Sequence, residues 1–176
     1  MTVTKTTLIK QSRLYDYFTA GDFLDCYSVP VGGTTIPISE LAQSLFQHMP
    51  PWVKGCLAVR DLAVLPFGLK STARLPTDRR FKKTLEVGDS INFFCVHSLS
   101  ENEIILGEDD SHLDFRISLC RESAASPQIF MSTWVHPHNL LGRLYLASIT
   151  PLHILIVTSQ LKKLARQYAD LSPVGY

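Results

Sequence analysis

The feature that most constrains this chain is a change in the spacing of its apolar residues near residue 80. From there to residue 136, apolar and polar residues alternate in segments near 80–87, 90–98, 103–107, 112–121 and 127–136. The breaks between these segments, such as VGD, SLSEN, EDDS and SAASP, are rich in turn-forming residues. Because connections this short join antiparallel neighbours, the segments predict an antiparallel meander.

Helical spacing frames the alternating region on both sides. In PISELAQSLFQHMP, apolar residues recur at helical spacing after Ser39, a candidate N-cap, and a second helix is predicted from Pro51 through WVKGCLAVRDLAVL. The two form a helical hairpin that follows a first strand within YDYFTAGDFLDCYSVPV. After HPHN the chain is predicted to be helical to about Asp170, nearly apolar around its circumference at first and basic towards its end.

These elements predict an α+β fold. A curved antiparallel sheet wrapped around the long C-terminal helix would bury the apolar surface of both. A chain of 176 residues suits a single domain over residues 1–176. We expect the polar residues 1–15 to be loosely ordered.

Composition disfavours several classes of protein. The chain has 17 basic and 16 acidic residues with no basic block, so no nucleic-acid partner is expected. The four cysteines are widely spaced and are predicted to be reduced thiols rather than zinc ligands. No secretory signal is evident, which favours a cytoplasmic location. The most apolar stretch, residues 144–157, is shorter than the roughly twenty residues that a membrane span needs. We therefore predict a buried helix there and no membrane span.

The segment GEDDSHLDFRIS carries polar side chains along one face of a predicted strand. His112, Asp114, Arg116 and Ser118 share that face, because alternate residues of a strand point the same way, and the apolar residues between them share the other. Two interpretations stay open at this point. The row is either a solvated sheet face with a weak pair between an aspartate and an arginine, or the lining of a mouth or interface.

Metal binding at this strand is disfavoured by geometry. Asp110, His112 and Asp114 have suitable donor groups, but along an extended strand they span roughly 13 Å and cannot converge on one ion. His136 and His138 lack a third partner at a diagnostic spacing. We predict no metal site and no cofactor.

The motif HNLLGRLY lies where the last strand leads into the long helix. Asn139 suits a helix N-cap, whereas Arg143 in the first turns is unfavourable against the helix dipole. Arg143 therefore suggests a carboxylate partner, for which Asp114 is the candidate, or an anionic ligand. The predicted ligand-binding residues are Asp114, Arg116, His138, Asn139, Arg143 and Tyr145.

Pro151 and His153 interrupt the apolar helix in the motif TPLH. A proline inside a helix removes one backbone hydrogen bond and usually kinks the helix. His153 is then either a core histidine bonded to the carbonyl that the proline leaves free, or an acid–base group that projects into a cavity. His112 and His153 are the candidate catalytic residues. No nucleophile elbow, cysteine–histidine signature or phosphate-binding loop is present, which disfavours hydrolases and kinases.

Three segments resemble a known family: LGEDDSHLDFRIS, HNLLGRLYLASITPLH and MPPWVKGCLAVRDLAVLPFGLK. They are similar to a bacterial family catalogued as domain of unknown function 2867, within the START and birch-pollen-allergen-like helix-grip superfamily. The resemblance covers residues 49–70 and 106–153, a little under half of the chain. It implies a helix-grip fold but no agreed activity. Relatives sometimes follow a dehydrogenase-like domain. The sequence of residues 1–176 contains no such domain, so we expect any redox role to need a separate partner.

Three functions remain in view, ranked mostly by analogy of fold. The first is a binding module for a small, largely apolar or amphipathic ligand in a cavity between the sheet and the C-terminal helix. The second is an enzyme of the cyclase or isomerase kind, in which His112 or His153 acts as acid or base on a carbonyl compound. The third is an accessory protein-interaction domain, in which the polar row meets a partner. Apart from the ligand, the candidate partners are a second copy of the chain, in a homodimer, and a separate dehydrogenase-like protein.

Overall fold

The computed structural model describes residues 2–31, 36–47, 50–55, 58, 82, 84–122 and 127–169. Within these residues one antiparallel sheet has the strand order β1-β2-β7-β6-β5-β4-β3. The strands are β1 (Thr4–Lys5), β2 (Phe23–Pro30), β3 (Ser90–Ile91), β4 (Phe94–Leu99), β5 (Glu103–Asp109), β6 (Leu113–Glu122) and β7 (Gln128–Pro137). The predicted antiparallel meander is confirmed from β4 to β7, and β2 joins it beside β7. The segment predicted as one strand over 90–98 is instead two strands, β3 and β4, which pair with each other.

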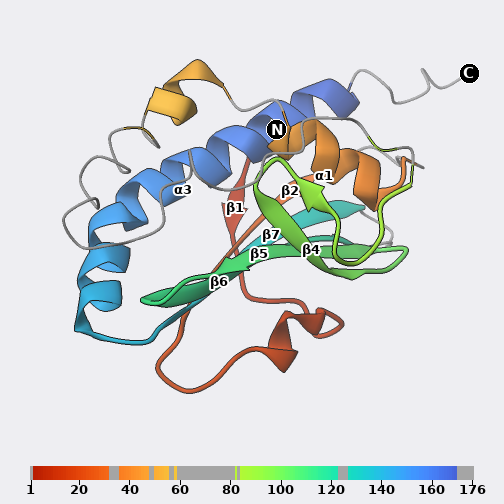
Figure 1. Cartoon of the computed structure of the whole chain (residues 1–176). Helices are drawn as coiled ribbons and strands as arrows, with labels where there is room; N and C mark the ends of the chain where they lie inside the picture. Colours follow the sequence, from red (N-terminus) through yellow and green to blue (C-terminus); the bar gives the residue numbers. More distant parts are fainter. Residues whose placement is uncertain are drawn as a thin grey trace, which may run out of the picture.

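Two helices lie on one face of the curved sheet, which we call the inner face (Figure 1). They are α1 (Ile38–Phe46) and the long C-terminal α3 (Leu140–Ala169). The α+β fold class is confirmed. Residues 51–55 after α1 are also helical, and the rest of the second helix of the predicted hairpin lies outside the described residues.

The main hydrophobic core lies between the inner face and these helices. Alternate residues of the strands supply one side of it and the sheet-facing residues of α1 and α3 supply the other, because a strand and a helix each expose one face to a neighbour. Each fully buried aliphatic side chain stabilises the fold by about 1.5–3 kcal/mol. Fully buried members include Leu41, Leu45, Ile104, Leu106, Leu119, Ile129, Leu161 and Leu164.

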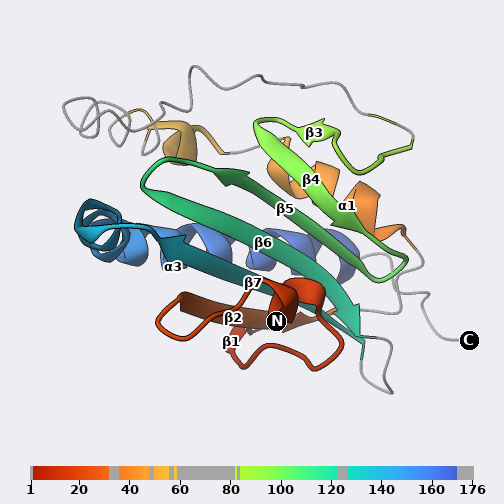
Figure 2. The ribbon, with the colours of Figure 1, turned by 60° about the horizontal axis from the view of Figure 1, so that its bottom comes forward.

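The N-terminal segment covers the opposite, outer face of the sheet (Figure 2). It includes the short helix η1 (Arg13–Asp16), and Leu14 is fully buried. Buried Glu103 of β5 holds this segment in place, accepting hydrogen bonds from Ser12 Oγ at 2.5 Å and from the Arg13 backbone N–H at 2.8 Å. Residues that we expected to be loosely ordered therefore form the second layer of the domain.

The strand predicted over 80–87 is wrong where the structure describes it, at residues 82 and 84–87. The Lys82 backbone N–H donates to Gln43 Oε1 at 2.8 Å, and Gln43 Nε2 donates to the Lys82 carbonyl at 2.9 Å. A side-chain amide of α1 thus satisfies backbone groups that a neighbouring strand would have paired. The chain then turns at Gly88, where φ is +94°, a conformation that favours glycine.

The apolar stretch of α3, predicted to be buried, is largely exposed. Leu144 is 61% exposed and Leu155 is 56% exposed, whereas Val157 and Leu161 further along are buried. A helix of 30 residues is about 45 Å long, while strands of 10 residues reach only about 33 Å, so the helix extends beyond the sheet that it crosses. By length and composition α3 meets the criteria for a membrane span, with 11% of the apolar window buried. Core helices of soluble proteins meet the same criteria, so this is weak evidence.

Candidate functional site

Arg116 of β6 is buried on the outer face, beneath the N-terminal segment. Its Nη1 lies 2.6 Å from Asp109 Oδ1, and its guanidinium lies 5.2 Å from the ring centre of Tyr17 and 6.0 Å from that of Trp134. The predicted alternation along this strand is correct, but the arginine is covered rather than solvated. Its partner is Asp109, so the weak pair with Asp114 that we considered is absent.

A polar patch joins the β5–β6 hairpin to the start of α3. We define this α3-start patch as His112, Asp114, His138 and Asn139. His138 Nε2 lies 3.0 Å from Asp114 Oδ2, and Asn139 Nδ2 lies 3.1 Å from His112 Nδ1. The hydrogen bond with Asp114 raises the pKa of His138, because it favours the charged imidazolium. The β5–β6 hairpin and the motif HNLLGRLY therefore lie in contact.

Asn139 also caps α3, as predicted from its type and position. Its Oδ1 accepts a hydrogen bond from the Gly142 backbone N–H at 2.9 Å. Gly142 packs so closely that a Cβ added to it would lie 2.2 Å from the His112 carbonyl oxygen. The first turn of the helix thus rests directly on the hairpin backbone, and only glycine permits this approach.

The predicted pair between Asp114 and Arg143 is wrong. Arg143 is exposed, and its guanidinium has no carboxylate partner among the residues that the structure describes. Asp114 points to the outer face, where His136 is its cross-strand neighbour, while α3 packs on the inner face. His138, in the connection between β7 and α3, reaches the Asp114 carboxylate. Arg143 does not reach it, because Arg143 lies on α3 at the inner face of the sheet. Tyr145 is half-buried on α3.

A second aspartate, Asp22, organises the outer face and was missed by the sequence reasoning. Its carboxylate accepts hydrogen bonds from Trp134 Nε1 at 2.8 Å and from the Thr19 backbone N–H at 2.8 Å, and it lies 2.6 Å from His136 Nδ1. Burial raises the pKa of Asp22, but the hydrogen bonds, foremost that of His136, outweigh burial and leave the pKa below its ordinary value. All of its acceptor atoms are engaged, which is typical of a structural carboxylate.

A different polar group lies on the inner face beneath α3. Asp25 of β2 and Thr133 of β7 are direct cross-strand neighbours, so their side chains share the inner face. His153 of α3 approaches from above, with its Nε2 3.2 Å from Asp25 Oδ1, and its ring meets Phe23 edge-on. We call Asp25, Thr133 and His153 the inner polar site. The expectation that His153 bonds a carbonyl freed by Pro151 is wrong, because its partner is this carboxylate.

Two oxygens of the inner polar site have no hydrogen-bond partner among the residues that the structure describes. Asp25 Oδ2 and Thr133 Oγ1 are both buried and unpaired, and both residues are buried as a whole, Asp25 being 7% and Thr133 4% exposed. Leaving a buried acceptor or hydroxyl unpaired costs about 1–3 kcal/mol, so native proteins retain few such groups. His153 is the accessible member, with its side chain 20% exposed. The site thus presents unused hydrogen-bonding capacity beside an apolar helix.

A sequence signal for this site existed. Within the strand FLDCYSVP, Asp25 has the same parity as Tyr27 and Val29, two residues of the main core. A carboxylate at that parity must face the core, where its burial is costly unless another group pairs with it. Such a residue is therefore a candidate member of a functional site. The partner, His153, lies 128 residues away in the sequence, so no local pattern identifies it.

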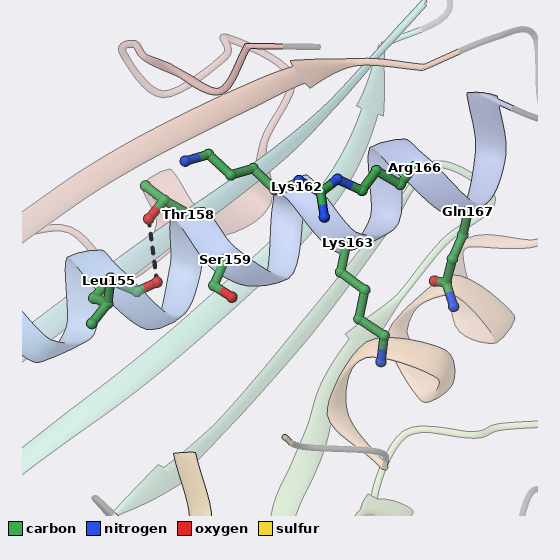
Figure 3. A pocket seen from close by; sticks show the side chains of 7 residues that line it. All are labelled: Leu155, Thr158, Ser159, Lys162, Lys163, Arg166 and Gln167. Atoms are coloured by element: carbon green, nitrogen blue, oxygen red, sulfur yellow. Dashed lines mark hydrogen bonds between the residues drawn. The ribbon is translucent and has the colours of Figure 1, made fainter. Parts of the chain in front are cut away.

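An open groove of about 450 Å³ lies along the second half of α3 (Figure 3). The described residues that line it are Leu155, Thr158, Ser159, Lys162, Lys163, Arg166 and Gln167. Three of these carry positive charge, and α3 contains no acidic residue. None of the residues predicted to bind a ligand lines this groove.

Within the described residues, no group of three histidine, cysteine or acidic side chains is arranged to hold a metal ion. Cys26, Cys95 and Cys120 are free thiols, and Cys56 lies outside the described residues. Burial raises the pKa of Cys120 to about 12, which makes that thiol a poor nucleophile.

The fold and these sites define an α+β domain whose antiparallel sheet carries a long helix on one face and the N-terminal segment on the other. The chain belongs to the family described as Protein of unknown function (DUF2867), whose family model matches residues 18–160. The comparison with curated proteins gives no match. The matched range contains the inner polar site and the α3-start patch.

Proposed function

We propose that this protein binds a small, largely apolar molecule between the inner face of the sheet and α3. The observation that carries the proposal is the pair of buried, unpaired oxygens, Asp25 Oδ2 and Thr133 Oγ1. Their cost to the unliganded fold is offset if a ligand supplies the missing partner. His153, held by Asp25 at the accessible side, completes the polar end of the site.

The surroundings of the inner polar site suit an apolar ligand body. Ile117 is the cross-strand neighbour of Thr133, and Ile156 lies one turn after His153 on α3. Both are only half-buried, as is Phe23 against the His153 ring. Ligand sites of this kind combine mostly apolar walls with a few placed polar groups.

The polar end of the ligand is a hydrogen-bond donor. Asp25 Oδ2 can only accept when ionised, and Thr133 Oγ1 can accept through its lone pairs. An alcohol, phenol or amine therefore fits, whereas a carboxylate ligand would place two negative groups together. This differs from the anionic ligand considered for Arg143, because Arg143 lies outside the inner polar site.

We also propose that the family belongs to the helix-grip superfamily of START and birch-pollen-allergen proteins. The support is the order of elements, with a curved antiparallel sheet against a long C-terminal helix. Ligand binding between sheet and helix is the function that this placement favours by analogy of fold.

The test uses three probes that share an octyl chain: octylamine, octanol and octanoate. Calorimetric titration should give binding in the order octylamine, octanol, octanoate. Asp25→Asn should weaken octylamine about tenfold or more, because a charge-assisted hydrogen bond is lost. Asp114→Asn is the matched control, since Asp114 pairs with His138 at 3.0 Å on the outer face. Equal affinities for all three probes, or equal effects of both substitutions, would refute the proposal.

The contact between Asp25 and His153 also favours an isomerase-type enzyme as the second candidate. A carboxylate that is hydrogen-bonded to one imidazole nitrogen orients the ring so that it can act as an acid or base. This favours His153 over His112 as the catalytic residue. The test is deuterium uptake from D2O beside the carbonyl of cyclohexanone, followed by NMR. Uptake that is lost in His153→Asn supports the enzyme, and its absence with intact octylamine binding supports a binding module alone.

A further inference from the structure

Arg116 of β6 has hydrogen-bonding capacity that the described residues leave unused. Its hydrogen bonds and its ion pair with Asp109 all run through Nη1, which donates to the Phe115 carbonyl at 2.8 Å. Its Nε is buried without a partner in the described chain, and the residue as a whole is only 6% exposed. The edge of the guanidinium formed by Nε and Nη2 therefore keeps its N–H donors, which are placed to bind an acceptor together.

A second unpartnered group lies on the same face of the sheet, on β4. His97 Nε2 is buried and has no hydrogen-bond partner among the described residues. Strand β5 lies between β4 and β6, and its Gly107 pairs with Arg116 on one side and with Cys95 on the other (Figure 2). A Cβ on Gly107 would lie 2.7 Å from Arg116 Cδ and 3.1 Å from Arg116 Nη1. The arginine side chain thus passes over the glycine, in the direction of β4.

The imidazole of His97 offers an acceptor at Nε2. Burial and the positive charge of Arg116 lower the pKa of His97, so the ring is neutral near pH 7. The opposing effects, of Asp109, the Gly107 backbone and Glu108, do not outweigh them. A backbone hydrogen bond that raises the pKa is one in which a carbonyl accepts from the ring, and Nδ1 is the donor because Nε2 has no partner. In a neutral ring the other nitrogen, Nε2, then accepts.

This combination of groups fits a cyclic amide. The carbonyl of an amide accepts from the Arg116 edge, and its N–H donates to His97 Nε2. An anion fits less well, because it would meet the lone pair of Nε2 and the carboxylate of Asp109. A peptide bond also fits less well, because in a trans amide the C=O and the N–H point in opposite directions. In a ring the two groups lie on the same side and can engage neighbouring partners.

We propose that the outer face of the sheet binds a small molecule through a cyclic amide or imide group held between Arg116 and His97. The Tyr17 ring, whose centre lies 5.2 Å from the guanidinium, covers the arginine and offers a flat surface to such a ring. Tyr17, Cys95 and His97 are only half-buried, which leaves an approach from solvent. The site is on the face opposite the inner polar site and does not depend on the ligand proposed there.

The first test is an NMR titration that observes the Arg116 Nε–H and the His97 ring. 2-Pyrrolidone, a cyclic amide, should shift both signals with one affinity. Three related probes should bind about tenfold more weakly or less, because each leaves a buried group unpaired: N-methyl-2-pyrrolidone without the N–H, N-methylacetamide as a trans amide, and butyrate as an anion. No shift with 2-pyrrolidone overturns the proposal. So does equal or tighter binding of butyrate, which indicates an anion site, or of N-methylacetamide, which indicates a peptide partner.

The second test assigns the two contacts by substitution. His97→Phe keeps an aromatic ring but removes the acceptor, so 2-pyrrolidone should bind no more tightly than N-methyl-2-pyrrolidone. His112→Phe is the matched control, because His112 is also a half-buried histidine but belongs to the α3-start patch, and it should leave both affinities unchanged. Arg116→Lys keeps the charge beside Asp109 without the two-donor edge and should weaken both probes.

The result for His97→Phe decides the proposal even if Arg116→Lys does not fold. A preference for 2-pyrrolidone over its N-methyl derivative that survives His97→Phe overturns the proposal, since the N–H of the probe would then have another partner. An equal loss of that preference in His112→Phe also overturns it, because the effect would not be specific to the site.

Discussion

Replacing Thr133 by valine should stabilise the unliganded protein. Thr133 is 4% exposed and its Oγ1 has no partner, so the folded state bears the desolvation cost of a hydroxyl, about 1–3 kcal/mol. Valine keeps the shape and suits the middle of strand β7. The free energy of unfolding should rise by about 1 kcal/mol or more, which corresponds to about 2–4 °C in Tm for a domain of this size. Urea unfolding followed by circular dichroism measures this directly.

Ser118→Ala is the matched control for Thr133→Val. Ser118 is a buried hydroxyl on the neighbouring strand β6, but it faces outward and donates to Glu103 at 2.6 Å. Its removal should lower the free energy of unfolding by about 1.5–3 kcal/mol, because a hydrogen bond to a charged group is lost. If Thr133→Val destabilises the protein as much as Ser118→Ala does, the hydroxyl of Thr133 is paired, and the reasoning behind the proposed site is wrong.

Three further outcomes are expected. Gly142→Ala should lower the free energy of unfolding although alanine is the better helix former, because its Cβ would meet the His112 carbonyl oxygen; a more stable variant would contradict the close approach. The pKa of His138 should lie above its ordinary 6.5 in an NMR titration and fall back in Asp114→Asn, so the pair stabilises the fold below pH 6.5 and loses this effect as the pH rises through the raised pKa. Titration of the denatured, unreduced protein should find four thiols, and two would indicate a disulfide.

The fold was largely predictable because its elements are periodic. Alternation identified β4 to β7, and the length of the C-terminal apolar stretch identified α3. The prediction of a strand near residue 82 was wrong because the side chain of Gln43, 39 residues earlier, forms hydrogen bonds with the Lys82 backbone. The packing of the N-terminal segment on the outer face was not predicted, because its polar composition conceals the contact of Ser12 with Glu103.

The sites were predictable only where both partners fall in neighbouring motifs. The N-cap role of Asn139 and the alternation of side chains along β6 were predicted correctly, because each depends on local sequence alone. The helix-dipole argument for Arg143 assumed that a lone cation needs a partner, but an exposed arginine remains solvated by water at little cost. The pair of Asp25 and His153 depends on how α3 crosses β2, which tertiary packing decides.

The most direct test of the proposed function is an NMR titration of the protein with octylamine, observing the Thr133 methyl group and the His153 ring. Both signals should shift together and saturate with one affinity, while the ring signals of His138 on the outer face stay in place. Shifts at the Leu144 and Leu155 methyl groups without change at Thr133 would show that the probe binds the outward side of α3 and would contradict a ligand site beneath the helix.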